Sequence, residues 1–357
     1  MPAAPREITV PLTPRARFDV IDVRAEAARQ HGDSLDEFEN CLYCSFHTTA
    51  GFLDQSLANR LDRQGQGVEA YVGAFRTVFP EGADYRHDKM EERTELTDAQ
   101  RVVEPRNGDS HLGFMAAGLK SVVTYQNPPE TTVRFVDLDG MQADRQPRQR
   151  VTTIVGYGSE EVVARVRINI PVSGHPVDSV NLKDPKLGVY EQLGELIAHF
   201  GVGKGRLRLD LSPKERNVGL TVNEYETLLM QHDLTEVMRN PVRFFAERGR
   251  HAWDDPRLVP SKTLGYAKYD LVRALNEALD KMGLSESLVE RALAKMMGVP
   301  AARFFRMKRS VSLLVSDRQD TGRGAIVEGT YQSPILVQWR SSETRAREVE
   351  ATLTRFI

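Results

Sequence analysis

The stretch EITVPLTPRARFDVIDV, residues 7–23, has a counterpart later in the chain, RINIPVSGHPVDSVNL, residues 167–182. In both stretches apolar and polar residues alternate through a proline, as in a strand that ends in a turn. An amphipathic helical stretch follows each, RAEAARQHG in the first and KLGVYEQLGELIAHFG in the second, and an apolar strand comes next. Because this order of elements occurs twice, we predict that the chain contains two copies of one unit.

The ends of the two copies are marked by a second pair of similar segments. Each half closes with a strand after Arg-x-Arg, PRQRVTTIVGYG at 147–158 and TRAREVEATLTRFI at 344–357. The tripeptide Thr-Tyr-Gln also occurs twice, at 124–126 and 330–332. We therefore place the boundary near residue 163, with no long linker between the halves.

The predicted domains are residues 1–163 and residues 164–357. The second domain has an extra segment near 266–305, where leucines recur at three- and four-residue spacing, and we predict helices there. The fold class we expect is α+β, with two tandem β-sandwich-like repeats and helices packed on their sheets. We expect the repeats to pack against each other and the chain to form a homo-oligomer.

Composition excludes several classes of function. The chain has 357 residues, 40% hydrophobic content and a formal net charge of −2. Such a balanced charge argues against a nucleic-acid partner. No apolar run approaches the roughly 18 residues of a membrane span, and the N-terminus lacks the apolar core of a signal peptide. We predict a cytoplasmic protein that binds neither nucleic acid nor a membrane.

Both cysteines lie in the stretch ENCLYCSFHTTAG, residues 39–51. A structural zinc site usually needs four ligands, and this chain has a single Cys-x-x-Cys pair. The apolar and aromatic neighbours predict a buried strand, in which residues three apart point to opposite faces. We interpret Cys41 and Cys44 as packing residues, so the functional candidate in this stretch is His47.

Further motifs follow His47 in a fixed order. The first half contains His47-Thr48-Thr49-Ala50, Tyr85-Arg86-His87, Asn107 with His111, and Pro147-Arg148-Gln149-Arg150. The second half contains Asn223-Glu224, Asp233, Gly329-Thr330-Tyr331-Gln332, Arg345 and Arg347. This series resembles the YjbQ-type proteins, a family labelled secondary thiamine-phosphate synthases. The resemblance covers nearly the whole chain, as two diverged copies.

The two halves depart from the family pattern in complementary ways. The first half has Gln55-Ser56 where the family has Asn-Glu, and the second has Glu215 where the family has the histidine of His-Thr-Thr-Ala. Family members associate as trimers of identical subunits. If their sites form between subunits, each copy in a duplicated chain needs to supply only one side.

Our hypothesis for the site is therefore a composite of the two halves. It combines candidate catalytic residues from both: His47, His87, His111, Asn223, Glu224 and Asp233. The competing interpretation is that the second half is a structural partner. In that case Asn223 and Glu224 form a turn and a helix cap.

The three histidines have alternative chemical roles. Three protein ligands with an open fourth position suit a catalytic divalent metal, and we expect zinc first, held by His47, His87 and His111. The histidines could instead carry protons without a metal. Three unrelated polar residues are the remaining alternative.

Arginine pairs suggest a small anionic substrate. Arg148 and Arg150 share a face if their segment is a strand, as do Arg345 and Arg347, and a guanidinium suits phosphate. The alternative is charged edge strands that block aggregation. The segment GVGKGR, 201–206, lacks Walker spacing, so no nucleotide cofactor is indicated. The residues expected to bind the substrate are Thr48, Thr49, Arg148, Arg150, Gln332 and Arg345.

Three functions remain open from the sequence. The resemblance implies an enzyme that joins a pyrimidine pyrophosphate to a thiazole phosphate, as a thiamine-phosphate synthase does. A metal-dependent hydrolase or lyase is the second hypothesis, and a non-catalytic ligand-binding or assembly protein is the third. An enzyme should bring the histidines together, whereas an assembly protein need not.

Overall fold

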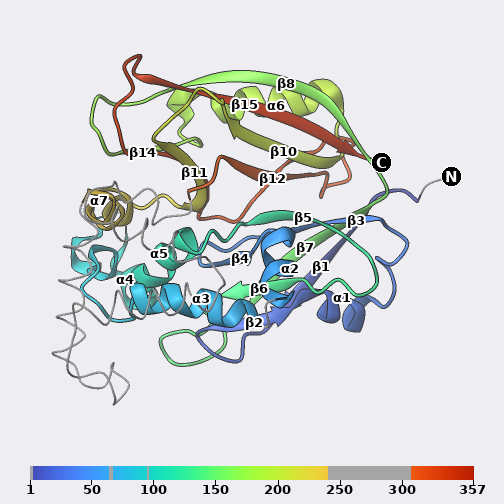
Figure 1. The fold of residues 1–357 in the computed structure, drawn as a ribbon, viewed down its shortest axis with the longest axis horizontal. Helices are drawn as coiled ribbons and strands as arrows, with labels where there is room; N and C mark the ends of the chain where they lie inside the picture. The colour runs from blue at the N-terminus through green and yellow to red at the C-terminus, as the bar shows by residue number, and fades with distance from the viewer. Residues whose placement is uncertain (1–2, 64–66, 95, 240–306) are drawn as a thin grey trace.

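The computed structural model describes residues 3–63, 67–94, 96–239 and 307–357. Over these residues the chain has an α+β fold with four antiparallel sheets and helices packed on them (Figure 1). The helical segment expected near 266–305 lies outside the described residues. In the described part of the chain, no helix is both long and apolar enough to cross a membrane.

The first half builds two sheets, with strand orders β1-β7-β3-β5 and β2-β6-β4. In β1, Val10 and Leu12 are buried and the residues beside them are exposed, as the alternating sequence predicts. The strands of this half are β1 Arg6–Leu12, β2 Asp19–Asp22, β3 Asn40–Ser45, β4 Ala50–Phe52, β5 Val122–Gln126, β6 Arg134–Asp137 and β7 Arg150–Tyr157.

Helices connect these strands and cover them. Asp22 caps the first helix by accepting from the backbone N–H groups of Arg24 and Ala25. Every residue of α5 is buried, which makes this helix the centre of the first half. The helices are α1 Val23–His31, α2 Gln55–Arg63, α3 Gly67–Val78, α4 Asp98–Val103 and α5 Gly108–Ala116, with short 3-10 turns η1 Arg86–Asp88 and η2 Met90–Glu92.

The second half also builds two sheets, with strand orders β13-β12-β10-β15-β8 and β11-β14-β9. Its strands are β8 Glu160–Pro171, β9 Asp178–Asn181, β10 Lys204–Leu211, β11 Val218–Glu224, β12 Ser310–Ser316, β13 Ala325–Val327, β14 Gln332–Gln338 and β15 Ala346–Phe356. Its helical elements are η3 Pro185–Leu187, α6 Val189–Phe200, the π-helical turn η4 Leu229–Asp233 and α7 Leu234–Arg239.

The strand order is the same in the two halves. Strands β1, β7, β3 and β5 have the same order as β8, β15, β10 and β12, and β2-β6-β4 matches β9-β14-β11. The register agrees as well, because Ala50 pairs with Asp137 as Val218 pairs with Gln338. His47 lies three residues before Ala50, and Glu215 lies three residues before Val218. Glu215 is therefore the structural counterpart of His47.

Two details of the predicted repeat differ from the structure. The first Thr-Tyr-Gln lies in β5, whereas the second lies at the start of β14, and these strands do not correspond. The similarity of the two tripeptides is therefore coincidental. The boundary near residue 163 falls inside β8, and the chain passes between the two halves at Gly158 and Ser159.

Apolar clusters join the halves into one core. One cluster contains Leu42 and Val122 with Leu314, and there the rings of Tyr157 and Phe356 stack at 3.9 Å. A second cluster joins α3 and α5 to α7 and β14. Figure 1 shows the result, with β11 of the second half lying next to α5. The second half is therefore held in a fixed position against the most buried helix of the first.

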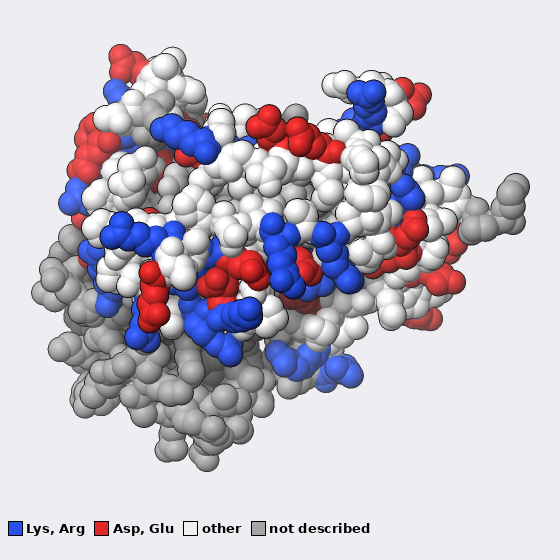
Figure 2. Space-filling view, turned by 90° about the horizontal axis from the view of Figure 1, so that it is seen from above, with Lys and Arg blue, Asp and Glu red and all other residues white. Residues whose placement is uncertain are grey.

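The surface over the second half carries charges of both signs. Figure 2 shows lysine and arginine side chains interspersed with aspartate and glutamate on this face. Ion pairs between strands of the second half include Arg167–Glu350 at 3.9 Å and Arg355–Glu161 at 3.0 Å. Positive and negative side chains therefore lie beside one another on this face, in agreement with the balanced net charge of the sequence.

Candidate functional site

Two histidines of the first half meet the end of β11. His87 lies in η1 and His111 in α5, and their side chains are 0% and 1% exposed. Their ring centroids are 4.9 Å apart with an interplanar angle of 71°. A Cβ on Gly108 would lie 2.9 Å from the Cβ of Tyr85, so glycine at this position lets α5 approach η1.

Both ring nitrogens of His87 act as hydrogen-bond donors. Asn107 Nδ2 donates to Asp139 Oδ2 at 2.7 Å, so Asn107 Oδ1 is left as the acceptor for His87 Nε2 at 2.9 Å. His87 Nδ1 faces Glu226 Oε2 at 3.3 Å. With an acceptor at each nitrogen, the surroundings of His87 favour the doubly protonated imidazolium.

The electrostatic surroundings of His87 lead to the same protonation state. Burial alone would lower the pKa of His87, but the hydrogen bond to Glu226 and the charges of Asp88 and Glu224 raise it to about 9. Burial tends to raise the pKa of Glu226, but hydrogen bonds from His87 and from backbone N–H groups lower it overall. His87 and Glu226 therefore form a buried ion pair at neutral pH.

His111 is held in the opposite, neutral state. Asn223 Oδ1 accepts from the backbone N–H of Glu224 at 2.7 Å, so this atom is the carbonyl oxygen of the amide. His111 Nδ1 lies 2.7 Å from the same oxygen and donates to it. Burial, followed by the charges of His87, Arg93 and Arg148, lowers the pKa of His111 well below its usual value.

The remaining nitrogen of His111 faces a carboxyl group. His111 Nε2 lies 3.4 Å from Glu224 Oε2. Burial raises the pKa of Glu224, although the charges of His87 and Arg93 oppose this shift. When Glu224 carries a proton, that proton faces the lone pair of a neutral imidazole, which is a geometry for proton transfer.

Arg93 connects the carboxylates of both halves. Its side chain is 2% exposed and reaches Glu104 at 3.1 Å, Glu224 at 3.6 Å and Glu226 at 3.9 Å. No motif of the sequence predicts a role for Arg93 or Glu226. The pattern around Arg93, EERTE, reads as an ordinary charged surface turn, and only the contact between the halves buries it.

Asp233 positions η1 from the other half of the chain. This fully buried side chain accepts from the backbone N–H of Arg86 through Oδ1 and from that of His87 through Oδ2, each at 2.9 Å. Its role in the structure is to orient the turn that carries His87. The structure thus brings His87 and His111 together with Asn223, Glu224 and Asp233, across the two halves.

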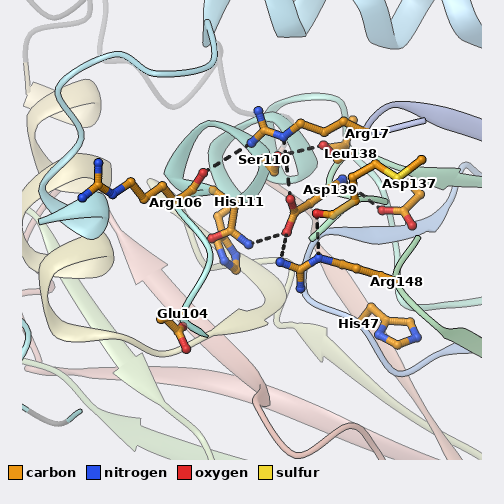
Figure 3. A network of polar contacts seen from close by, with 12 residues as sticks. Arg17, His47, Glu104, Arg106, Ser110, His111, Asp137, Leu138, Asp139 and Arg148 are labelled. Carbon is orange, nitrogen blue, oxygen red and sulfur yellow. Dashed lines mark hydrogen bonds and ion pairs between the residues drawn. The ribbon is translucent and has the colours of Figure 1, made fainter. Parts of the chain in front are cut away.

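His47 does not join the other two histidines. Its Nε2 accepts from the backbone N–H of Val151 at 3.0 Å, and its Nδ1 lies 3.5 Å from Arg150 Nη1. Burial, then the charges of Arg150 and Arg148, lowers the pKa of His47 to about 3. Figure 3 shows the Arg148 side chain between His47 and His111.

The predicted three-histidine donor set does not fit a divalent metal. Both nitrogens of His87 donate hydrogen bonds, and Nε2 of His47 is used by a backbone N–H group. Within the described residues, no three His, Cys, Asp or Glu side chains are arranged to hold a metal ion. A ligand role for all three histidines would require these hydrogen bonds to break.

Two of the three predicted substrate-binding arginines, Arg148 and Arg150, bind aspartates of the protein. Arg150 is buried and binds Asp137 at 2.7 Å and 3.0 Å. Arg148 binds Asp139 at 3.2 Å but keeps a side-chain exposure of 22%. Arg345 is exposed just before β15 and does not share the buried setting of Arg347, because the strand begins only at the next residue.

The other predicted substrate-binding residues lie in the loop after β3 or contact it. Gln332 Nε2 donates to the carbonyl oxygens of Ser45 and His47, each at 3.0 Å, so it ties the second half to this loop. The backbone oxygen of Thr49 accepts from Leu138 at 3.1 Å, and Thr48 beside it is half-buried. These three predicted residues thus surround His47 rather than the His87–His111 pair.

The second half repeats the arrangement around His47 with different residues. Glu215 Oε2 binds Arg347 Nη1 at 2.9 Å, and Glu215 Oε1 accepts from the backbone N–H of Glu348 at 2.9 Å. His47 likewise accepts the next backbone N–H, from Val151, and its ring lies beside Arg150 as Glu215 lies beside Arg347. We call these two arrangements the His47 latch and the Glu215 latch.

The cysteines are packing residues, as predicted. Both are free and buried, with Cys41 in the core of the first half and Cys44 in the cluster that contacts the second half. Burial raises the pKa of the Cys41 thiol to about 12 and that of Cys44 further. Such thiols are not nucleophiles at neutral pH.

Comparisons with known proteins find solved structures of low similarity and no activity. No family model and no curated protein matches the chain. A YbjQ-like protein of unknown function from Sulfolobus solfataricus has 14% identity and a TM-score of 0.29, covering 55% of this chain and 99% of its own. A hypothetical protein from Aeropyrum pernix has 14% identity and a TM-score of 0.28, covering 54% and 98%.

A third similar structure is an uncharacterized conserved protein of the YjbQ/UPF0047 family from Clostridium acetobutylicum. It has 13% identity and a TM-score of 0.24, covering 54% of this chain and 99% of its own. In each case almost the whole of the other protein corresponds to about half of this chain.

Proposed function

We propose that this chain is an enzyme that acts on a small phosphorylated or heterocyclic substrate by proton transfer at His111 and Glu224. The observation that carries the proposal is the pair of adjacent histidines with opposite pKa shifts. The pKa of His87 is raised to about 9, whereas that of His111 is lowered well below its usual value. Pairs of titratable groups whose surroundings separate their pKa values are typical of acid–base sites.

The hydrogen bonds assign a task to each group. Asn223 holds the proton of His111 on Nδ1, so Nε2 is free to accept a proton. Glu224 faces that nitrogen and has a side-chain exposure of 17%, so the substrate would meet the pair from the Glu224 side. His87 and Arg93 are fixed cations that would stabilise negative charge as it develops on the substrate.

The finer hypothesis is the transfer that the motif resemblance implies. The carbon–oxygen bond between the pyrimidine methylene group and pyrophosphate would break, and a bond from that carbon to the thiazole nitrogen would form. His87 and Arg93 would stabilise the leaving pyrophosphate. A metal-dependent hydrolase or lyase is less well supported, because the histidines do not form a donor set for a metal.

The test compares turnover in matched variants of the full chain. The purified protein is incubated with the pyrimidine pyrophosphate and the thiazole phosphate, and products are followed by mass spectrometry. Glu224→Gln and His111→Asn should each lower turnover by roughly a hundredfold or more, because general acid–base groups contribute about that much. Glu191→Gln, an exposed residue of α6, is the control and should have no effect.

Each failure of this test has a defined meaning. Full turnover in folded Glu224→Gln and His111→Asn would overturn the proposed roles. No product with these substrates would reject the thiamine-type transfer, and other phosphorylated heterocycles would then be screened by thermal shift. Stoichiometric zinc in elemental analysis, lost in His111→Asn, would instead favour the metal-dependent alternative.

A further inference from the structure

Asn223 has one buried polar atom that the protein leaves unpaired. The side chain is fully buried, and Oδ1 interacts with both His111 and the backbone of Glu224. Among the described residues, Asn223 Nδ2 has no hydrogen-bond partner. Exchanging the two ends of the amide would set an NH2 group against the N–H of Glu224, so the unpaired atom is the donor.

A buried donor that is unpaired within the protein needs a hydrogen-bond acceptor from a bound molecule. Buried polar groups in folded proteins almost always have a hydrogen-bond partner. The rest of the site is closely paired, as for Asn107, which uses both ends of its amide on His87 and Asp139. The exception therefore lies at the atom next to the proposed proton acceptor.

Cationic side chains lie near the same position, and His87 and Arg93 among them are paired with Glu104, Glu224 and Glu226. The charges of His87, Arg93 and Arg148 all act on His111 and lower its pKa. Figure 3 shows the Arg148 side chain reaching toward His111 from the Asp139 side. The carboxyl group in contact with His111 is that of Glu224, and burial raises its pKa.

We propose that Asn223 Nδ2 is the recognition donor for an oxyanion of the ligand, a phosphoryl or carboxylate oxygen that binds beside His111. His87 and Arg93, which pair with Glu226 and Glu224, are the buried cations of this site. The inference rests on the proposed function, since it names the substrate group that the same site would take. It also moves the anion site from the predicted Arg150, Gln332 and Arg345 to the junction of the halves.

The substitution Asn223→Asp isolates the donor. An aspartate is isosteric, and one of its oxygens can still accept from His111 and from the backbone of Glu224. The other oxygen replaces Nδ2, so the variant loses the donor and gains repulsion. The matched control is Asn127→Asp, because Asn127 Nδ2 already donates to the carbonyl oxygens of Leu35 and Phe38.

The probe is inorganic phosphate, with acetate as a second probe, titrated into the full chain. Binding is measured by calorimetry, and by the side-chain amide signal of Asn223 in a two-dimensional NMR spectrum. We expect saturable phosphate binding that shifts this signal, weakened roughly tenfold to a hundredfold in Asn223→Asp and unchanged in Asn127→Asp. Binding of phosphate alone would assign a phosphoryl group, and binding of acetate as well would extend the site to carboxylates.

Two results would overturn the inference. One is equal phosphate binding by Asn223→Asp and the wild type. The other is an Asn223 amide signal in the wild type that neither probe shifts, a measurement that does not depend on the variant folding. Glu224→Gln separates this inference from the proposed function, because it should lose turnover and keep phosphate binding. Phosphate binding without turnover of the two tested substrates would leave the oxyanion site standing and reject the thiamine-type transfer.

Discussion

The two latches have the same geometry and different chemistry. In the first half His47 accepts a backbone N–H and faces Arg150, and in the second half Glu215 does the same with Arg347. An imidazole and a carboxylate can fill one role because both accept a hydrogen bond in the plane of the group. The comparison indicates that this position holds the loop to the closing strand, and that His47 need not be part of the reaction.

The residue eight positions after His47 differs in its surroundings from the residue eight positions after Glu215, and this difference bears directly on the candidate site. Asn223 is buried against His111, whereas Gln55 is half-buried and bonds to the backbone of Gln126. The difference arises because the first half covers the end of β11. The latches thus belong to the internal structure of each half, and the residues with the most unusual surroundings lie where the halves meet.

The largest expected effect comes from breaking the latches at their arginines. Arg150→Ala leaves the fully buried Asp137 without its partner and should lower the free energy of unfolding by about 3–5 kcal/mol. Arg347→Ala should cost less, about 1–3 kcal/mol, since Gln338 is neutral and Glu215 is partly exposed. Urea unfolding monitored by circular dichroism measures the free energy of unfolding of both variants. Equal losses in Arg150→Ala and Arg347→Ala would show that the buried charge on Asp137 does not make the first latch more costly to break.

An exchange of latch residues sharpens the comparison. His47→Ala should cost about 1–3 kcal/mol because it leaves the N–H of Val151 unpaired, whereas His47→Glu should cost less because the carboxylate can take over this contact and bind Arg150. Both are measured by urea unfolding at neutral pH. A loss in His47→Glu as large as that in His47→Ala would mean that the latches are not interchangeable.

The pH dependence of stability should have two limbs. The pKa of His47 is about 3 in the fold and near 6.5 when unfolded, so its contribution is complete above pH 6.5 and declines as the pH falls toward 3. The pKa of His87 is raised to about 9, so its contribution is complete below pH 6.5 and is lost as the pH rises through about 9. Urea midpoints across this range test both, and His47→Glu should move the acid limb to lower pH.

Much of the fold follows from the sequence because its patterns are local. The alternation in β1 and the buried stretch from Cys41 to Cys44 predict strands that the structure contains. The Asn223–Glu224 pair was predicted to meet the histidines because each half lacks a motif that the other half keeps. That expectation agrees with the observed contacts of His111 with both residues.

The remaining site residues depend on contacts that no local pattern carries. His47 was grouped with the other histidines because it belongs to the same motif series, but its ring turns to Val151 on the neighbouring strand. Glu226 and Arg93 lie in polar segments and become buried only when the halves pack. The one feature of the sequence that points to Glu226 as a site residue is its position two residues after Glu224.

The smallest expected effect comes from the unused counterpart of Glu224. Ser56 is exposed, so Ser56→Glu should change the free energy of unfolding by less than about 0.5 kcal/mol. Turnover should also be unchanged, in contrast to Glu224→Gln. A change in activity with Ser56→Glu would indicate that the first half contributes to the site at this position as well.

The central claim is that the two halves hold adjacent histidines in opposite protonation states. The most direct measurement is a long-range proton–nitrogen NMR spectrum of the imidazole rings between pH 5 and about 9, a window in which an ordinary histidine titrates. His87→Gln and His111→Asn assign the two rings among the eight histidines. We predict that His87 keeps protons on both nitrogens well above pH 6.5, and that His111 stays neutral throughout with its proton on Nδ1. Two rings that both titrate near pH 6.5, or a His111 proton on Nε2, would contradict the account.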